Sequence, residues 1–341
     1  MPDSRFTAPT ATASRPLERP ARSPHEQALI KHQYDVVLGC PRSGTTFLME
    51  ALDAIPSIEC VTGTILPVSI PHLANADLPP ELYDALAVGA ERALDDYMES
   101  GRARSRAAGL QKRVNAPTGP SGLTAALTGR PGLSRLVYKE PFLSFAPELV
   151  YYALPDAKMI HLVRDGRDCA NSLRRTYDVL TDEHLTHLMG AEMRLGRKVD
   201  HRYVPWWVEE GREHEFLDAS PYGRSVWMWA YMVRRCHDFF AQPEVQDSGR
   251  VMPLRYEDFM EAPLQWGQAV LDHLGLDFTA GVRRRGPHAP TAVIRTHQRR
   301  PPPPAGGCPP PAPAAPQPSV DSSAPSPPPS SFVVPAFRRP P

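Results

Sequence analysis

Residues 34–46 read YDVVLGCPRSGTT, and this stretch decides the fold. An apolar run at 36–38 leads into a loop bracketed by Gly39 and Gly44, and the segment FLMEALDAI at 47–55 then repeats its apolar residues at helical spacing. The order predicts a buried strand, a glycine loop and the start of a helix. Such a loop directs consecutive backbone N–H groups and the positive end of the helix dipole at one place. A phosphate is the natural ligand there.

The loop differs from that of common nucleotide triphosphatases at one position. Gly39 and Gly44 have the spacing of a Walker A loop, but Thr45 occupies the place of its lysine, and the nearest cation is Arg42. A P-loop kinase or NTPase therefore stays an alternative rather than the leading interpretation. Cys40 suggests a phosphatase only if an arginine follows six residues later, and that position is Thr46, so we interpret Cys40 as an inert loop thiol.

The amino-acid composition indicates which classes of binding partner and which cellular compartment suit this protein. The formal net charge of the 341 residues is zero, which favours neither a nucleic acid nor a membrane as partner. The five cysteines are scattered without CxxC or His/Cys spacing, so we expect no metal site, no disulfide framework and a reducing, cytoplasmic location. No apolar run reaches the length of a membrane span, and the N-terminus lacks the apolar core of a secretory signal.

The two ends of the chain differ from its middle. We expect residues 1–30 to be a disordered N-terminal segment and 291–341 to be a Pro-rich disordered tail, since 301–341 alone hold 17 of the 41 prolines. Between them, residues 31–290 alternate strands with helices. That alternation predicts one α/β domain with a central parallel sheet and helices on both faces.

Local patterns predict the elements of this domain. Strands are expected near 36–38, 135–138, 158–163 and 250–254, the last at a sheet edge because it contains Pro253. The predicted helices lie near 47–55, 79–100, 146–154, 169–175, 222–240 and 263–274. Residues 57–71 are expected to form a loop, and 181–200 to be helical.

A second stretch has the same strand-to-helix character as the glycine loop. Residues 164–172 read RDGRDCANS and follow the apolar segment at 158–163. Arg164 closes the predicted strand and Ser172 lies in the helix after it, so both can face one phosphate. By itself this is an ordinary turn with an ion pair. Together with the glycine loop, it favours a nucleotide that carries two separate phosphate groups.

Four motifs, taken in order, resemble a known family. CPRSGTTFL at 40–48, YKEPF at 138–142, HLVRDGRDCANSL at 161–173 and LRYEDF at 254–259 occur in the order seen in sulfotransferases. The chain resembles the bacterial-type soluble branch over about residues 33–280, and is also similar to the tyrosylprotein sulfotransferases. The resemblance implies a P-loop NTPase-like three-layer fold. It also implies 3′-phosphoadenosine 5′-phosphosulfate (PAPS) as sulfuryl donor, a small-molecule or glycan-like hydroxyl acceptor, and no metal.

The resemblance assigns roles to particular residues. The 5′-phosphosulfate loop of the family corresponds to Arg42, Ser43, Gly44, Thr45 and Thr46. Its 3′-phosphate site corresponds to Arg164 and Ser172, and Tyr256 matches a tyrosine near the bound nucleotide. Lys139 matches a strand-end lysine that touches the transferring group in the tyrosylprotein and heparan branches. Arg42 and Lys139 are therefore the expected charge-stabilising catalytic residues.

The general base is where this chain departs from the family. Related enzymes place a glutamate in the segment after the first helix, and Gly63 occupies that position here. The candidates nearby are His72 and Glu59, which we rank first, and Glu140. The missing glutamate also supports another interpretation, that of a non-catalytic nucleotide-binding relative. The sequence does not indicate the acceptor or the oligomeric state.

Overall fold

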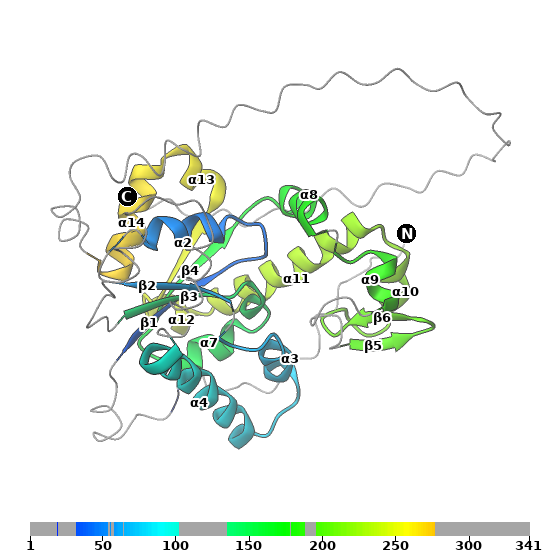
Figure 1. The fold of residues 1–341 in the computed structure, drawn as a ribbon, viewed down its shortest axis with the longest axis horizontal. Helices are drawn as coiled ribbons and strands as arrows, with labels where there is room; N and C mark the ends of the chain where they lie inside the picture. The colour runs from blue at the N-terminus through cyan, green and yellow to red at the C-terminus, as the bar shows by residue number, and fades with distance from the viewer. Residues whose placement is uncertain are drawn as a thin grey trace, which may run out of the picture. The chain divides into compact units, whose positions relative to one another are not determined.

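A five-stranded parallel sheet forms the centre of the molecule, with its strands in the order β2-β3-β1-β4-β7 (Figure 1). The computed structural model describes residue 19 and residues 32–53, 55, 58–63, 65–101, 135–177, 179–187 and 196–276. They belong to one compact unit, Met1–Arg284. The strands are β1 (Gln33–Leu38), β2 (Glu59–Thr62), β3 (Arg135–Lys139), β4 (Lys158–Val163) and β7 (Val251–Arg255).

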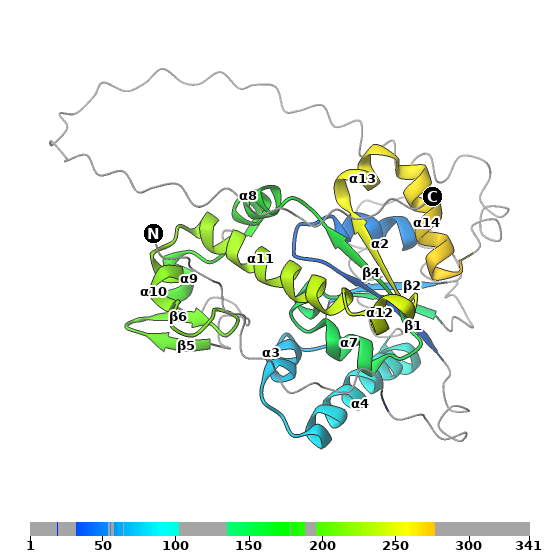
Figure 2. The same ribbon diagram turned by 180° about the vertical axis from the view of Figure 1, so that it is seen from behind.

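Helices cover both faces of this sheet because successive residues of its strands point to opposite sides. In β1, Val36 and Leu38 pack on one side against α4 (Pro80–Asp96) and α7 (Pro147–Ala153). Val37 packs on the other side, where the covering helices are α2 (Thr45–Asp53), α13 (Tyr256–Glu261) and α14 (Pro263–Leu274). Figures 1 and 2 show the two helical layers with the sheet between them. This confirms the predicted three-layer α/β architecture.

A third group of elements packs beyond the carboxyl ends of the strands. It contains α8 (Gly166–Tyr177), α9 (Asp182–His187), α10 (Glu213–Asp218), the antiparallel pair β5 (Gly196–Val199) and β6 (Arg202–Pro205), and the first part of α11 (Pro221–Phe240). The end of α11 reaches the sheet layers, where Phe239 packs on Tyr151 of α7 and Phe240 on His161 of β4. Arg224 of α11 is 1% exposed and ties the group together. Its guanidinium donates to the carbonyls of Leu180, Phe216 and Leu217 and pairs with Asp182.

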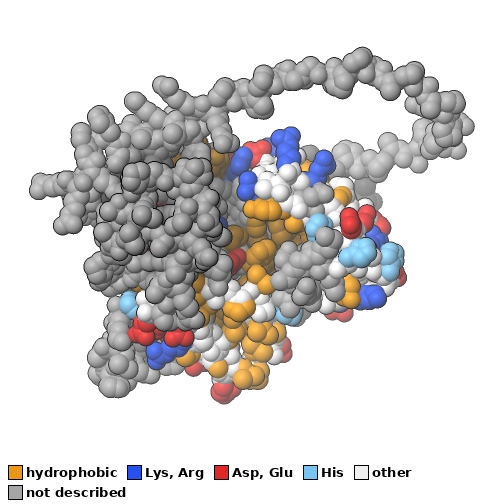
Figure 3. All heavy atoms as spheres, viewed as in Figure 1, with side chains coloured by type: hydrophobic (Ala, Val, Ile, Leu, Met, Phe, Trp, Pro, Cys, Tyr) orange, Lys and Arg blue, Asp and Glu red, His pale blue; other side chains and the backbone are white. Residues whose placement is uncertain are grey.

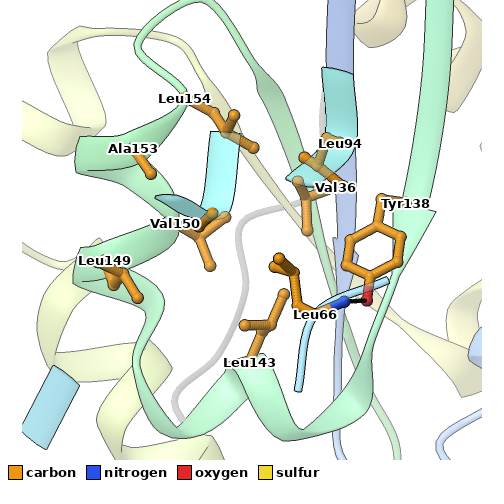
Figure 4. A pocket seen from close by; sticks show the side chains of 10 residues that line it. Val36, Leu66, Leu94, Tyr138, Leu143, Leu149, Val150, Ala153 and Leu154 are labelled. Carbon is orange, nitrogen blue, oxygen red and sulfur yellow. Dashed lines mark hydrogen bonds between the residues drawn. The ribbon is translucent and has the colours of Figure 1, made fainter. Parts of the chain in front are cut away.

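The shorter elements connect these layers. They are α3 (Ile70–Asn75), the π-helical turn η1 (Tyr97–Gly101), the 3₁₀ helix η2 (Pro141–Phe145) and α12 (Pro243–Asp247). Figure 4 shows a small cavity in which Val36, Leu143 and Val150 point toward one another. Its lining is apolar, and the Tyr138 hydroxyl at its edge accepts a hydrogen bond from the Leu66 amide at 3.1 Å. We interpret this cavity as part of the core.

The structure corrects two sequence predictions and confirms a third. Residues 57–71 are not all loop, because Glu59–Thr62 pairs with β3 as the edge strand β2. Residues 181–200 are not one helix: α9 ends at His187, and the strand β5 begins at Gly196. Pro253 does lie on an edge strand, β7, where its missing N–H costs no ladder hydrogen bond. Within the predicted N-terminal segment 1–30 only Arg19 is described, and it pairs with Glu91 of α4 at 2.8 Å. The rest of the predicted terminal segments and both domain boundaries lie outside the described residues.

None of the helices in the described ranges combines the length and the apolar character that crossing a membrane requires.

Asp35 links three strands and offers a test of the sheet. Its buried carboxylate accepts from Arg135 Nε of β3 at 2.6 Å and from the Lys158 amide of β4 at 3.1 Å. We predict that Asp35→Ala lowers the free energy of unfolding by roughly 3–5 kcal/mol, because it leaves a mostly buried guanidinium without its partner. Urea denaturation monitored by circular dichroism measures this change.

The matched control is Arg92→Ala, which removes an exposed ion pair with Asp95 at 3.7 Å. It should change the free energy of unfolding by less than about 1 kcal/mol. Equal effects of the two substitutions would show that the Asp35 pair does not hold the strands together.

Candidate active site

The glycine loop between β1 and α2 has a backbone that other residues would strain. Gly39 has a φ of 152°, and a Cβ there would lie 2.4 Å from the Leu162 carbonyl oxygen. The Gly39 amide donates to the Ser144 hydroxyl at 2.8 Å. Arg42 is not a glycine and nevertheless has a φ of 73°. The loop is therefore held in a conformation that its residues do not adopt freely.

The start of α2 directs amides out of this loop. The helix begins at Thr45, and the amides of its first turn have no partner within the helix. Ser43 behaves differently from its neighbours, because its amide and its hydroxyl both donate to the Cys40 carbonyl, at 3.1 and 2.7 Å. Ser43 is 0% exposed. Its polar groups brace the turn, and Gly44, Thr45 and Thr46 present the amides. Burial raises the pKa of Cys40 well above its ordinary value, as expected of an inert thiol.

The structure brings the two predicted anion-binding stretches into direct contact. Arg42 Nε donates to Ser172 Oγ of α8 at 2.8 Å. In the reverse direction, Arg164 Nη1 donates to the Arg42 carbonyl at 3.4 Å. The loop after β1 and the junction after β4 therefore form one continuous site along the carboxyl edge of the sheet. This is the edge at which open α/β sheets bind ligands.

Tyr256 covers the loop at the other side. Its ring lies against Gly44, where a Cβ would come within 2.4 Å of Tyr256 Cδ2. The Arg164 guanidinium lies 4.7 Å from the centroid of the same ring. Tyr256 is the first residue of α13, directly after β7. The tyrosine thus fixes the arginine and requires glycine at position 44.

Contacts with α11 and α8 hold Arg164 in place, but one of its guanidinium N–H groups remains able to donate a hydrogen bond. Its carbonyl accepts from Trp229 Nε1 of α11 at 3.0 Å, and a Cβ on Gly166 would lie 2.5 Å from the Trp229 ring. Its Nη2 pairs with Asp168 at 3.2 Å. Its Nε is buried and has no hydrogen-bond partner among the described residues. A buried donor without a partner fits a site that an anion completes.

Lys139 brings a second cation to the same loop. It ends β3 beside β1, because Val37 pairs with Lys139 in the register of the two strands. Its Nζ lies 3.4 Å from Thr46 Oγ1, and the residue is 5% exposed. Burial lowers the pKa of Lys139, the neighbouring Glu140 opposes this, and the Arg42 charge adds to it.

Glu140 and Gly63 form a contact that the sequence does not reveal. A Cβ on Gly63, whose φ is 60°, would lie 3.2 Å from Glu140 Oε2. The Gly63 amide donates to the Lys139 carbonyl at 2.8 Å. Glu140 Oε1 accepts from the Phe142 amide at 3.2 Å. Burial raises the pKa of Glu140, which is 8% exposed. Glu140 thus lies beside Gly63, the residue at the position where the sequence comparison led us to expect a glutamate.

The two residues ranked first as bases lie elsewhere. Glu59 begins β2 and pairs with Leu136, three residues before Thr62 pairs with Lys139. At about 3.3 Å per residue, its backbone lies roughly 10 Å from the carboxyl edge. His72 lies on α3 with its ring 5.3 Å from that of Trp206, and burial lowers its pKa. The structure therefore places Glu59 away from the carboxyl end of its strand and His72 against Trp206.

An aromatic cluster borders the site on the side of α3. Phe145 of η2 is in ring contact with Trp206, Trp207 and Tyr231. His72, Phe142, Trp206 and Tyr231 are partly exposed. On this face of the molecule, hydrophobic side chains form a band below the Lys and Arg side chains that cover α8 (Figure 3). The cluster begins two residues after Glu140.

The sequence did not indicate three contacts that hold the site in place. They are the hydrogen bond of Ser144 with Gly39, that of Trp229 with Arg164, and the approach of Glu140 to Gly63. Each joins residues more than 60 positions apart, and no local pattern indicates such pairs. Ser144 alone had a signal, because it follows the strand-end motif YKEPF closely. Among the described residues, His, Cys, Asp and Glu form no group of three that could hold a metal ion.

Comparison with known proteins agrees with the four sulfotransferase motifs of the sequence. The model of the sulfotransferase family matches residues 36–218. No protein with curated function matches the chain. Among solved structures, a sulfotransferase domain from the curacin biosynthetic pathway is 18% identical, with coverage of 72% of this chain and 75% of that chain and a TM-score of 0.36.

Two further structures are similar to the chain at the same level. The sulfotransferase domain of the Synechococcus PCC 7002 olefin synthase is 19% identical over 79% of this chain and 84% of that chain, with a TM-score of 0.38. A sulfotransferase from Alicyclobacillus acidocaldarius is 17% identical over 72% and 81%, with a TM-score of 0.36. Because these TM-scores are low, the family assignment rests on the sequence match.

The contact between Gly44 and Tyr256 predicts a coupled pair. Gly44→Ala should lower the free energy of unfolding by roughly 1–3 kcal/mol, because its Cβ meets the ring at a positive φ. Tyr256→Ala removes the clash, so the double variant should be less destabilised than the sum of the two single changes. Urea denaturation of the four proteins measures this coupling.

Gly267→Ala is the control, because no atom lies within 4 Å of the added Cβ in helix α14. It should be neutral or stabilising by up to about 1 kcal/mol. Additive effects of Gly44→Ala and Tyr256→Ala would contradict the close approach.

Proposed function

Because the chain belongs to the sulfotransferase family, we propose that it transfers a sulfuryl group from PAPS to a hydroxyl of a small-molecule or glycan-like acceptor. The observation that carries this proposal is the contact of Arg42 with Arg164, which follows β4, and with Ser172 of α8. It joins two anion-binding strand–helix junctions into one site. PAPS has two separate anionic groups on one nucleoside, which suits such a site.

The loop after β1 suits the 5′-phosphosulfate of PAPS. Gly44, Thr45 and Thr46 would offer their amides to its oxygens, and the dipole of α2 adds positive potential. Arg42 would supply charge near the same group. Ser43 would act on the shape of the loop, since its donors are used within the turn.

The junction after β4 suits the 3′-phosphate. Arg164 has a buried Nε that finds no hydrogen-bond partner in the described part of the chain. Ser172 Oγ can accept from Arg42 while it donates its own proton to an anion. Tyr256 lies between Gly44 and Arg164, where it would border the nucleotide. The residues present therefore fit the donor, and the scattered spacing of the cysteines suits the cytoplasmic location that we propose.

Lys139 is the residue best placed to assist the transfer itself. Sulfuryl transfer resembles phosphoryl transfer, in which positioning and charge stabilisation do most of the work. The Lys139 ammonium is near Thr46 and largely dry, so its charge would act strongly on the oxygen that leaves with the phosphate. The aromatic cluster, including His72, would face the acceptor, because flat rings can pack on apolar molecules and on sugar faces.

Binding of 3′,5′-adenosine bisphosphate, the product nucleotide, tests the site by isothermal titration calorimetry. We expect the wild type to bind it, and Arg42→Ala and Arg164→Ala each to weaken binding by about 10- to 100-fold, as the loss of a charged hydrogen bond predicts. Arg175→Ala is the matched control, since it removes the same charge from an exposed position of α8.

No binding by the wild type, or equal weakening by all three substitutions, would contradict the proposed site. Mg-dependent turnover of ATP by the purified protein would favour a P-loop kinase or NTPase instead. Nucleotide binding without transfer from labelled PAPS to any of a broad set of acceptors would favour a non-catalytic relative.

Lys139 should also determine how the rate depends on pH. Lys139→Met should lower kcat by about 10²- to 10³-fold, the usual effect of removing one charge-stabilising donor. In the wild type, kcat should fall as pH rises through the lowered pKa of Lys139, because the charged form is the active one. Initial rates from labelled PAPS across a pH series measure both effects.

Lys158→Met is the control for charge and stability. Lys158 begins β4, which β1 separates from β3, and it lies at the opposite end of its strand, where its Nζ donates to the Gly249 carbonyl at 2.9 Å. A kcat that falls equally in both variants would remove Lys139 from the mechanism.

A further inference from the structure

We propose that Glu140 is the general base of this enzyme and accepts the proton of the acceptor hydroxyl. This inference rests on the proposed sulfuryl transfer. It replaces His72 and Glu59, the residues that sequence order favours, with a carboxylate from the end of β3.

The place of Glu140 is the first argument. It directly follows Lys139, whose Nζ reaches Thr46 of the phosphate loop. Its Oε2 lies 3.2 Å from the position of a Cβ on Gly63. A glutamate at position 63 would start from that Cβ, so the Glu140 carboxylate already fills the space that such a side chain would enter. The two segments are held in place by the bond from the Gly63 amide to the Lys139 carbonyl.

The two carboxylate oxygens of Glu140 have different surroundings, and this difference is the second argument. Oε1 accepts from the Phe142 amide and thereby caps η2. Oε2 accepts no hydrogen bond from the described residues, and none of the ion pairs among them includes Glu140. A carboxylate that is held by one oxygen while the other stays available has the geometry a base needs.

Burial gives the third argument. Only 8% of Glu140 is exposed, and the residue lies between Lys139 and the partly exposed aromatic cluster that starts at Phe142. Burial raises its pKa, so the ionised carboxylate binds a proton more strongly than an exposed one would. The hydrogen bond from the Phe142 amide and the charge of Lys139 both oppose this effect of burial on the pKa.

The proton and electron pairs balance without a further reactant. The acceptor oxygen forms a bond to sulfur while its proton moves to Glu140. The bond between sulfur and the bridging oxygen breaks, and that oxygen leaves with the electron pair on 3′,5′-adenosine bisphosphate. Nothing is oxidised or reduced, and Glu140 later returns its proton to water.

The substitution Glu140→Gln separates this role from a structural one. The amide oxygen of glutamine can still cap η2 by accepting from the Phe142 amide, but the side chain no longer takes up a proton. Glu59→Gln tests the rival carboxylate on β2. Glu81→Gln, at an exposed position in the first turn of α4, is the matched surface control.

The assay measures PAPS consumption with three acceptors: benzyl alcohol, 4-nitrophenol and water alone. We expect Glu140→Gln to slow transfer to benzyl alcohol by about 10²- to 10⁴-fold, the usual contribution of a positioned base. The loss with 4-nitrophenol should be clearly smaller, because this phenol is acidic enough to ionise near neutral pH. The wild-type rate should fall as pH drops through the raised pKa of Glu140, and the variant should lack this acid limb.

Calorimetry with 3′,5′-adenosine bisphosphate distinguishes a failure of the proposed function from a failure of the Glu140 assignment. If the wild type does not bind this nucleotide, the proposed function itself fails. If it binds, and Glu140→Gln consumes PAPS as fast as the wild type with every acceptor, only the assignment of Glu140 is overturned. Equal losses with benzyl alcohol and 4-nitrophenol, or a larger loss in Glu59→Gln, would overturn it as well.

Discussion

The parallel register of β3, β1 and β4 is the constraint on which the site depends. Because Val37 pairs with Lys139 and Leu38 with His161, the three strands end at one edge within a few residues of each other. The glycine loop, the strand-end lysine and the arginine junction all follow directly from those ends. A shift of one strand by a single residue would turn its side chains to the opposite face and disperse the site.

Much of this arrangement was predictable from the sequence. The apolar runs before Gly39 and before Arg164 are short and bounded by turn residues, so they indicated buried strands, and their order with the helices indicated a parallel sheet. Parallel strands bring their carboxyl ends together, so the meeting of the Arg42 loop with Ser172 followed from topology alone. Even the edge position of Pro253 followed, because proline cannot donate to a ladder.

Other features depended on contacts between distant segments. Strand β2 has four residues and lies at the sheet edge, so its pattern is too short to separate from a loop. Nothing local to Gly63 indicates that the Glu140 carboxylate lies beside it, nor that Glu59 begins the strand three residues too early. Tertiary packing decided these cases.

The backbone of Arg42 has a consequence for the balance between stability and activity. Arg42 has a φ of 73°, a conformation that costs free energy for most residues with a side chain but less for glycine or asparagine. The chain carries an arginine there, whose guanidinium reaches Ser172 and whose carbonyl receives Arg164. Replacement by glycine would relax the turn and remove the charge at once. The loop thus holds its strain at the residue that brings positive charge to the proposed donor site, so a substitution that stabilises this turn would weaken that site.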